Sequence, residues 1–177
     1  MAEAGKKALR ASTIIAAIIA AVLYVLDAFV LSLPFFALVL FAVVLFYFLP
    51  ATLWALRSDR RVARLRATKA GIYLLATVST FVTIGLQNSM ADRRAVKVGD
   101  ACLAYRAKYH HYPKNLKALV PEFISSIPVA RYGLLANDSF FYSSREDDRE
   151  PMLYYEAIPP FGRRFYHMET RSWGYLD

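Results

Sequence analysis

The pattern of hydrophobic and polar positions changes abruptly near residue 89. Between Thr13 and Leu56 the only charged residue is Asp27. This run is longer than any helix or strand of a soluble core, and it is long enough to cross a bilayer twice at about 20 residues per pass. After residue 89, charged residues recur throughout the chain. The pattern predicts a membrane domain over residues 1–89 and a water-soluble domain over residues 90–177.

Proline and a third apolar stretch divide the membrane domain into three helices. Pro34 lacks a backbone donor and disfavours helical angles in the residue before it, so it separates two helices. We predict transmembrane helices at about 12–31, 34–56 and 70–88. Threonines in the third stretch favour packing against other helices over contact with lipid alone. The alternative for residues 1–31 is a cleaved signal peptide, which an apolar core longer than about 7–15 residues disfavours.

Basic residues indicate how the helices are oriented. The chain has a formal net charge of +8, and most of it lies at the N-terminus and in a predicted loop before the third helix. The basic residues of that loop are Arg57, Arg60, Arg61, Arg64, Arg66 and Lys69. Cytoplasmic loops are enriched in Lys and Arg, so we expect a cytoplasmic N-terminus and a periplasmic soluble domain. Arg93, Arg94 and Lys97 flank the third helix on the opposite side and weaken this argument.

The same basic loop suggests a ligand. Lys and Arg side chains near a membrane surface attract anionic lipid headgroups, and we expect the loop to do so. Nucleic-acid binding is disfavoured because the loop is short and contains no interleaved aromatic residues.

The soluble domain begins with a helix. Ala95, Val98, Cys102 and Tyr105 recur at spacings of three and four and form an apolar stripe. Cys102 is the only cysteine, and on this stripe it is expected to be a small buried hydrophobic residue. No proline interrupts the chain between the third membrane helix and Pro113. We therefore expect that helix to continue into the soluble domain.

Aromatic-rich segments of strand length follow. A short helix is predicted at 114–120, then strands at 139–143, 152–157 and 164–168, and a closing edge strand at 172–175. Loops rich in charge, or in proline and glycine, separate these strands. The predicted fold class is α+β, with three transmembrane helices, the third of which continues into a long helix packed on a small antiparallel sheet.

One set of residues in the soluble domain resembles a known family. The set comprises Ala101–Tyr105, Tyr112–Pro113, Leu116, Leu119–Pro121, Phe123–Ile124 and Ile127–Pro128. It resembles the segment of type IV pilins and type II secretion pseudopilins in which a long N-terminal helix ends before an antiparallel sheet. The resemblance covers about residues 90–177 and implies a pilin-like domain.

The chain also departs from that family. Pilin subunits have a cleavable leader followed by a start that contains a glutamate, and no segment of that kind precedes Ile72. Two further predicted hydrophobic helices precede the third one in the chain. The Asp-Pro-Trp-Gly turn common in pseudopilins is replaced by Val129-Ala130-Arg131. The resemblance therefore implies a pilin-type domain fixed to a membrane anchor, not a subunit that is processed and polymerised.

Candidate catalytic and metal-ligating residues are few. His110 and His111 adjoin, and neighbouring residues of a helix point about 100° apart. With His167 and Glu169 they could form a zinc site, but a solvated helix end is the favoured interpretation. The acidic run at 146–150 could bind calcium, yet it lacks the D-x-(D/N)-x-(D/N)-G spacing and is more typical of a charged hairpin tip. Motifs of nucleophilic and phosphate-binding sites are absent from the sequence, so we expect no enzyme activity and no cofactor.

Two groups of residues carry the functional hypotheses. Asp27 is the only carboxylate of the long apolar run, and such residues are functional candidates by default, although its position near the hairpin tip also allows it to reach the interface. In the soluble domain the predicted partner-binding residues are Arg163, Arg164, Arg171 and Trp173, because aromatic and arginine side chains often anchor interfaces.

The sequence therefore predicts a multi-pass protein of the bacterial inner membrane. We expect a non-catalytic accessory or scaffolding subunit that binds other membrane or periplasmic proteins in a hetero-oligomer. One alternative is an accessory component of a type II secretion or type IV pilus system. The other is a small transporter or channel component that uses Asp27. For a scaffold, Asp27→Asn is expected to be silent, whereas a transporter is expected to lose its function.

Overall fold

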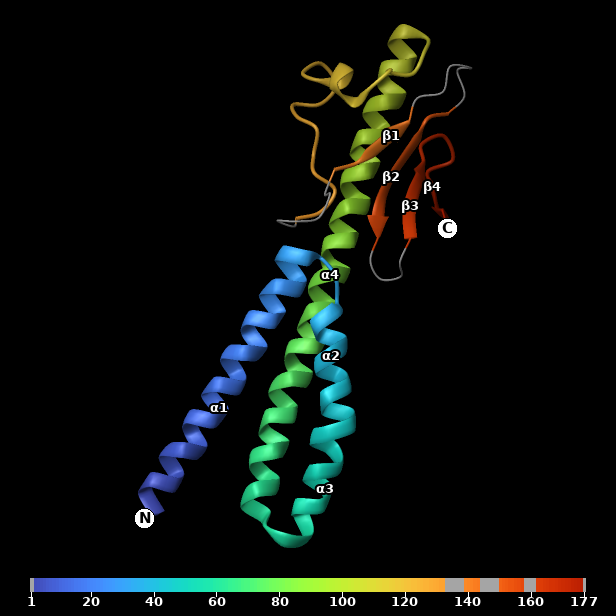
Figure 1. Cartoon of the computed structure of the whole chain (residues 1–177). Helices are drawn as coiled ribbons and strands as arrows, with labels where there is room; N and C mark the ends of the chain where they lie inside the picture. Colours follow the sequence, from blue (N-terminus) through green and yellow to red (C-terminus); the bar gives the residue numbers. More distant parts are fainter. Residues whose placement is uncertain (1, 133–138, 144–149, 158–161, 177) are drawn as a thin grey trace. The chain divides into compact units, whose positions relative to one another are not determined.

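The computed structural model describes residues 2–132, 139–143, 150–157 and 162–176, with side chains from Arg10 onward. The chain forms two compact units, Met1–Ile84 and Gly85–Asp177. Helix α4, Arg60–Tyr109, contributes residues to both (Figure 1). Because this helix is continuous, the boundary between the two units, after Ile84, falls inside it. Each unit is described separately below.

The first unit is helical. Helix α1 (Ala2–Val25) is followed by a π-helical turn, η1. After the chain reverses, the second arm of the helical hairpin comprises α2, a second π-helical turn, η2, and α3. Their bounds are η1 Leu26–Leu31, α2 Phe35–Val43, η2 Val44–Phe48 and α3 Leu49–Ser58. The predicted break at Pro34 is confirmed, and Ser32 turns the chain there with a φ of 52°. The turn η2 lies just before Pro50, and its wider spacing accommodates a residue that cannot donate a helical hydrogen bond.

The basic segment 57–69 is not a loop, contrary to the prediction. Helix α3 extends to Ser58, Asp59 is the only connecting residue, and α4 begins at Arg60. The carboxylate of Asp59 accepts hydrogen bonds from the backbone N–H groups of Arg61 at 2.8 Å and Val62 at 3.4 Å, and so caps the new helix. The residues that follow are mostly arginine, alanine, leucine and lysine, which are strong helix formers.

Burial in the first unit is inverted relative to a water-soluble bundle. The buried apolar side chains are mainly small, namely Ala16, Ala20, Ala28, Ala37, Ala55 and Ala63. Large apolar side chains point outward, and Ile14, Leu38 and Leu53 are each more than half exposed. Small residues between helices and large apolar residues outside are typical of helices packed in lipid. Within the described residues, three helices are long and apolar enough to cross a membrane.

Polar side chains join the helices of this unit. The hydroxyls of Tyr24 and Thr83 lie 3.0 Å apart, and the Thr77 hydroxyl donates to the carbonyl oxygen of Ala37 at 3.3 Å. The threonines of α4 thus contact neighbouring helices, as the sequence predicts.

The second unit consists of a helix and a four-stranded antiparallel sheet. After α4 come a short 3₁₀ helix, η3 (Leu116–Leu119), and strands β1 (Phe141–Ser143), β2 (Met152–Ala157), β3 (Gly162–His167) and β4 (Ser172–Leu176), paired in the order of the chain. The predicted α+β arrangement is confirmed for this unit. The long helix ends at Tyr109, before Pro113, because His110 adopts a φ of 62°. The predicted helix at 114–120 is shorter and of the 3₁₀ type.

The core lies between α4 and one face of the sheet. The predicted stripe is buried at Ala95, Val98 and Cys102, and it packs with Leu153 and Tyr155 of β2 in one apolar cluster. Alternate residues of each strand point to opposite faces, so one face of the sheet contacts the helix and the other, here called the outer face, points away from it.

Gly99 allows a close approach of helix and sheet. A Cβ atom at this position would lie 2.7 Å from the ring of Tyr166. Glycine in a helix interior costs about 1 kcal/mol relative to alanine, and here that cost is offset by the packing of Tyr166 directly on the helix backbone.

Candidate functional site

The outer face of the sheet has a row of aromatic residues across it. Phe141, Tyr154, Phe165 and Gly174 are directly opposite one another on β1 to β4. The rings of Phe141 and Tyr154 are stacked, with centroids 5.0 Å apart and planes 10° from parallel. All three aromatic side chains are half-buried. Cross-strand aromatic pairs stabilise a sheet, and this row also forms a continuous apolar strip.

Gly174 completes the row by leaving space for a neighbour. A Cβ atom there would lie 2.3 Å from the ring of Phe165. The ring therefore covers the glycine, a packing arrangement that protects a glycine near a sheet edge. Beside the row, the exposed Arg163 places its guanidinium 5.8 Å from the centroid of the Tyr154 ring. We refer to Phe141, Tyr154, Phe165 and Arg163 as the outer-face patch.

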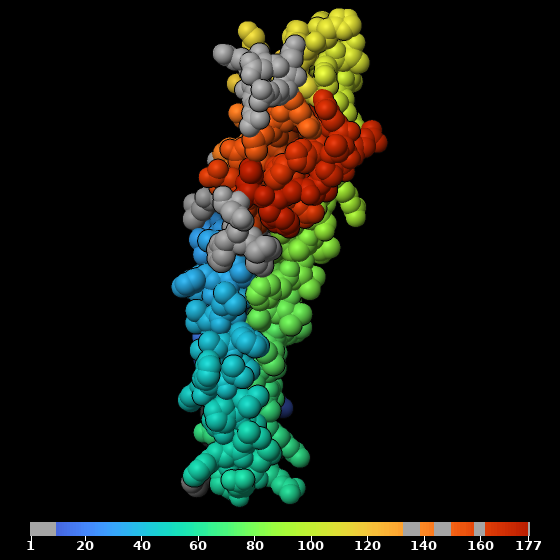
Figure 2. Space-filling view, turned by 90° about the vertical axis from the view of Figure 1, so that its right-hand side faces the viewer, coloured from blue at the N-terminus to red at the C-terminus, as the bar shows by residue number. Residues whose placement is uncertain are grey.

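The sheet face that carries this patch is opposite the face that packs on α4. Helix α4 covers the other face of the sheet, and no second helix of this unit, among the described residues, lies over the outer face (Figure 1). The C-terminal strands, drawn in red, lie at the surface of the unit (Figure 2). Aromatic residues and arginine on an accessible face are the usual anchors of protein interfaces.

The four predicted partner-binding residues do not share one face. Arg163 is on the outer face, whereas Arg164 and Trp173 are on the face that packs toward α4. Arg164 forms an ion pair with Asp92 at 3.1 Å, and its guanidinium lies 4.8 Å from the Trp173 ring centroid. These two side chains are therefore engaged within the unit.

Arg171 occupies the turn between β3 and β4. Its φ is 52°, and it forms an ion pair with Asp100 of α4 at 3.2 Å. Sequence reasoning missed Phe141, Tyr154 and Phe165 as a group. Their alternation with buried residues places them on the outer face, but the strand register that aligns them cannot be read from the sequence.

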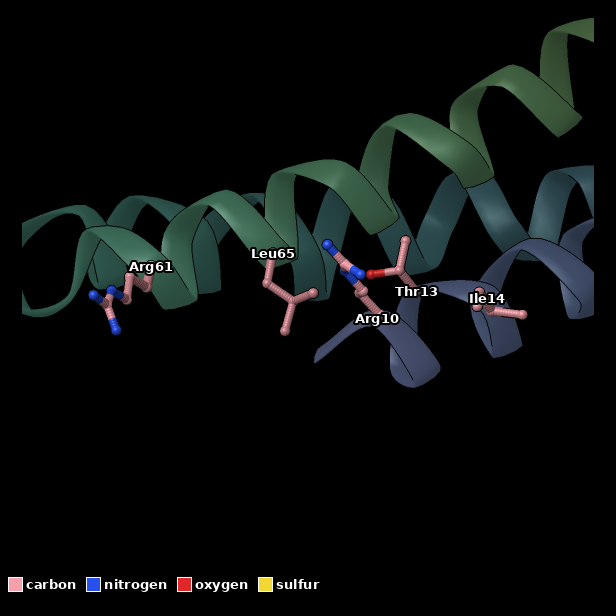
Figure 3. A pocket seen from close by; sticks show the side chains of 5 residues that line it. All are labelled: Arg10, Thr13, Ile14, Arg61 and Leu65. Atoms are coloured by element: carbon pink, nitrogen blue, oxygen red, sulfur yellow. The ribbon is translucent and has the colours of Figure 1, made fainter. Parts of the chain in front are cut away.

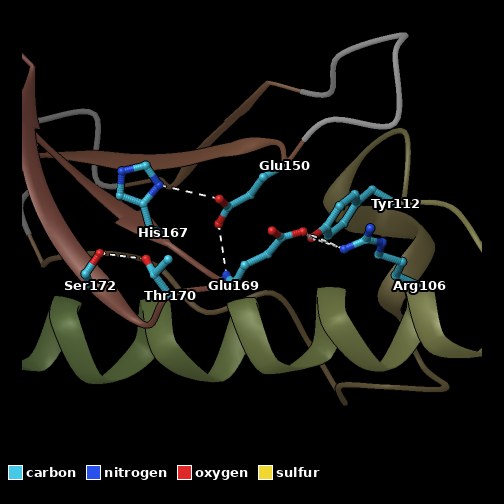
Figure 4. Close-up of polar contacts among 7 residues, drawn as sticks. All are labelled: Arg106, Tyr112, Glu150, His167, Glu169, Thr170 and Ser172. Atoms are coloured by element: carbon cyan, nitrogen blue, oxygen red, sulfur yellow. Dashed lines mark hydrogen bonds and ion pairs between the residues drawn. The ribbon is translucent and has the colours of Figure 1, made fainter.

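A second cluster of polar residues lies where α4 ends beside the sheet (Figure 4). The carboxylate of Glu169 accepts hydrogen bonds from Tyr112 at 3.0 Å and from Arg106 at 2.5 Å. Glu150 accepts from the backbone N–H of Glu169 at 3.0 Å, and its carboxylate lies 3.5 Å from His167 Nδ1. These contacts fix the β3–β4 turn to the helix end.

Titration of this cluster follows from its contacts. Burial raises the pKa of Tyr112 to about 12, so its hydroxyl remains a donor at physiological pH. The hydrogen bonds from Tyr112 and Arg106 lower the pKa of the Glu169 carboxyl, because they stabilise its ionised form.

We expect Glu169→Gln to lower stability at neutral pH and to leave it unchanged in acid. A depressed carboxyl pKa contributes stability above the unfolded pKa, near 4.5, that is lost as the pH falls through the folded pKa. Thermal unfolding of the full chain in detergent at about pH 7 and about pH 3 measures this. Glu156→Gln, which changes an exposed carboxylate of β2, is the control. Equal pH profiles for Glu169→Gln and the wild-type chain would contradict the assignment.

The histidines and acidic residues do not form a metal centre in the described part of the chain. No group of three or more His, Cys, Asp or Glu side chains there could hold an ion. His111 Nδ1 lies 3.0 Å from the carbonyl oxygen of Tyr112, and His167 is beside Glu150. Of the acidic run at 146–150, which the sequence predicts to be a charged hairpin tip, only Glu150 lies within the described residues.

Asp27 is buried within the first unit and has no exposed surface. Its two carboxylate oxygens accept hydrogen bonds from the N–H groups of Phe36 at 3.0 Å and Ala37 at 2.6 Å. Its backbone carbonyl accepts from Ser32 and, at 3.2 Å, from Leu33. One residue thus holds the reversal of the chain between η1 and α2, and it caps the N-terminus of α2.

The six basic residues near the start of α4 fall into two groups. Arg66 donates to the carbonyl oxygen of Ala51 in α3, and Lys69 donates to the hydroxyl of Ser12 in α1, both at 2.6 Å. These two side chains therefore connect α4 to α3 and to α1, at the basic end of the first unit. The other four are exposed, namely Arg57, Arg60, Arg61 and Arg64.

The chain was compared with protein-family models, with curated proteins and with solved structures. None of the three comparisons finds a match.

Proposed function

We propose that this protein is a membrane-anchored, non-catalytic accessory or scaffolding subunit of a bacterial envelope complex. Its soluble unit binds a protein partner through the outer-face patch. The observation that carries this proposal is the row of Phe141, Tyr154 and Phe165 beside Arg163, on a sheet face that α4 does not cover.

The composition of the patch supports a protein partner. Interface hot spots are enriched in tyrosine and arginine, and they lie where apolar area can be removed from water. The aromatic rings are fixed by stacking and by Gly174 before any partner arrives, so little side-chain entropy is lost on binding. Arg163 supplies a charge that favours a partner with a carboxylate at the edge of its contact area.

The anchor supports a location in the inner membrane. Three helices are long and apolar enough to span, and the basic residues gather at the N-terminal side of α4. By the tendency of Lys and Arg to remain in the cytoplasm, the N-terminus is cytoplasmic and the soluble unit is periplasmic.

The alternative of a type II secretion or type IV pilus accessory has its own support. A long helix, a short segment between Pro113 and Pro121, and an antiparallel meander follow one another in the soluble unit. This is the order of elements that the pilin resemblance implies. A transporter based on Asp27 has no comparable support, because helix N–H groups occupy both carboxylate oxygens.

Site-specific photocrosslinking in cells tests the patch. A benzophenone amino acid at Tyr154 or Phe165 is expected to form an adduct with one other envelope protein. Adding Arg163→Glu is expected to weaken binding about thirtyfold and to reduce the adduct accordingly, because interface hot spots are worth about 2 kcal/mol or more.

Tyr132 and Tyr175 are matched control positions, since they are exposed aromatic residues of the same unit outside the patch, at 55% and 53%. The proposal requires that they do not give the same adduct. It is wrong if all four positions label the same proteins equally, if Arg163→Glu has no effect, or if the adduct contains only a second copy of this chain.

A further inference from the structure

Two pockets follow each other along the junction of α1 and α4 in the first unit. The first has a volume of about 410 Å³ and is lined by Arg10, Thr13 and Ile14 of α1 and by Arg61 and Leu65 of α4 (Figure 3). The second, of about 310 Å³, is lined by residues further along both helices, among them Ala17, Ala20 and Ala21 of α1.

The two pockets use the same face of each helix. On α1 the lining residues recur at spacings of four and three, and they include Arg10, Ile14, Ala17, Ala21 and Tyr24. On α4 they keep to one stripe, which includes Arg61, Leu65, Ile72, Ala76 and Ser79. Residues at these spacings lie one above the other on a helix. The pockets are therefore successive parts of one groove, here called the α1–α4 groove.

The groove has the dimensions of one lipid chain. From Arg10 to Tyr24 it runs for about 21 Å, at about 1.5 Å per residue. One leaflet of a bilayer has a hydrocarbon depth of about 15 Å. The alanines of α1 leave a furrow, and its walls are accessible, since Ile14 is 58% and Leu75 is 69% exposed. In Figure 1, α1 diverges from α4 toward its N-terminal end.

The groove is basic at one end and apolar along its length. Its described lining at the N-terminal end of α1 includes two arginines and no carboxylate. In Figure 3, Arg10 and Arg61 lie on either side of Leu65. Arginine is suited to phosphate because its planar guanidinium donates several hydrogen bonds. Charge and apolar surface are therefore arranged as in a phospholipid, with the anion at one end and the chain behind it.

We propose that the α1–α4 groove binds one anionic phospholipid. The guanidinium groups of Arg10 and Arg61 hold the phosphate, and an acyl chain lies along the furrow of Ala17 and Ala21. The basic residues of α4 therefore have different roles. Arg61 lines the groove, whereas Arg60 and Arg64 do not. Arg66 and Lys69 form hydrogen bonds to neighbouring helices. The groove is separate from the outer-face patch, so either proposal can fail alone.

Native mass spectrometry of the detergent-purified full chain tests this site. Phosphatidylglycerol and phosphatidylcholine with identical acyl chains are titrated onto the wild-type chain, onto Arg10→Gln/Arg61→Gln, and onto Arg60→Gln/Arg64→Gln. The two variants lose the same charge, but only the first alters the groove. Phosphatidylglycerol is expected to bind the first variant about thirtyfold more weakly than the other two proteins, because two arginine contacts to the phosphate are lost, each worth about 1 kcal/mol.

Two further measurements test whether free phosphate can replace the lipid and whether the furrow contributes to binding. Inorganic phosphate is expected to give no comparable binding, and Ala17→Leu/Ala21→Leu is expected to weaken phosphatidylglycerol binding with both arginines present. Thermal unfolding without lipid shows that each variant is folded. Equal loss in the two arginine variants, equal binding of both lipids, phosphate binding as strong as lipid binding, or dimerisation that excludes lipid would overturn the proposal.

Discussion

Replacing Leu153 with alanine is expected to lower the free energy of unfolding of the second unit by about 2–5 kcal/mol. Leu153 is fully buried in β2, in the same cluster as Val98, Cys102 and Met168. Truncation removes apolar surface from the core and leaves a cavity that the packed strands cannot fill completely. This loss is a large fraction of the total free energy of unfolding of an ordinary domain, which is about 5–15 kcal/mol.

Chemical denaturation followed by the fluorescence of Trp173 measures this loss, in a Trp54→Phe background so that one unit is observed. Met152→Ala is the matched control, because the neighbouring residue is on the outer face and only half-buried. Similar midpoints for the two alanine variants would show that the core is not where the structure places it.

Asp27→Ala is expected to destabilise the first unit by about 2 kcal/mol. The change removes both acceptors for the N–H groups of Phe36 and Ala37, and water cannot replace them at a residue with no exposed surface. Asp27→Asn retains one carbonyl oxygen, so we expect an intermediate loss of stability. Thermal unfolding in a mild detergent, followed by circular dichroism, measures both variants.

Thr80→Val is the control for Asp27, since the buried Thr80 hydroxyl donates to Ala76 of its own helix. A cap predicts a graded series in which alanine is worse than asparagine and asparagine is worse than the wild type. Unchanged stability in both Asp27 variants would remove the structural role and would again favour a role in transport.

Much of the fold follows from local patterns of residues. The apolar run broken at Pro34 predicts the first two helices, because proline and the lack of charge act locally. The segment 152–157 alternates buried residues with half-buried or exposed ones, and the strand there agrees with the prediction. The helix that begins at Arg60 was missed because its basic residues were interpreted as a loop, although a single capping aspartate, Asp59, is enough to begin it.

The candidate sites were harder to predict because they depend on pairing between distant residues. Arg164 and Trp173 are suitable residues for an interface, but the fold places Arg164 beside Asp92 and Trp173 beside Arg164, within the unit. The register of β1 and β2 aligns Phe141 with Tyr154, a pairing that no sequence pattern specifies. The sequence marks Asp27 as unusual, but its hydrogen-bond donors, the N–H groups of Phe36 and Ala37, come beside it only through the fold of the hairpin.

The sheet is a meander in which every strand pairs with the strand that precedes it along the chain. Each hairpin therefore closes over a short stretch of polypeptide, and the contact order of the sheet is low. Low contact order favours rapid folding, because little loop entropy is lost before the new contacts form. The strands can be added one at a time in the order of the chain, and the sheet is complete only when Ser172–Leu176 pairs with β3.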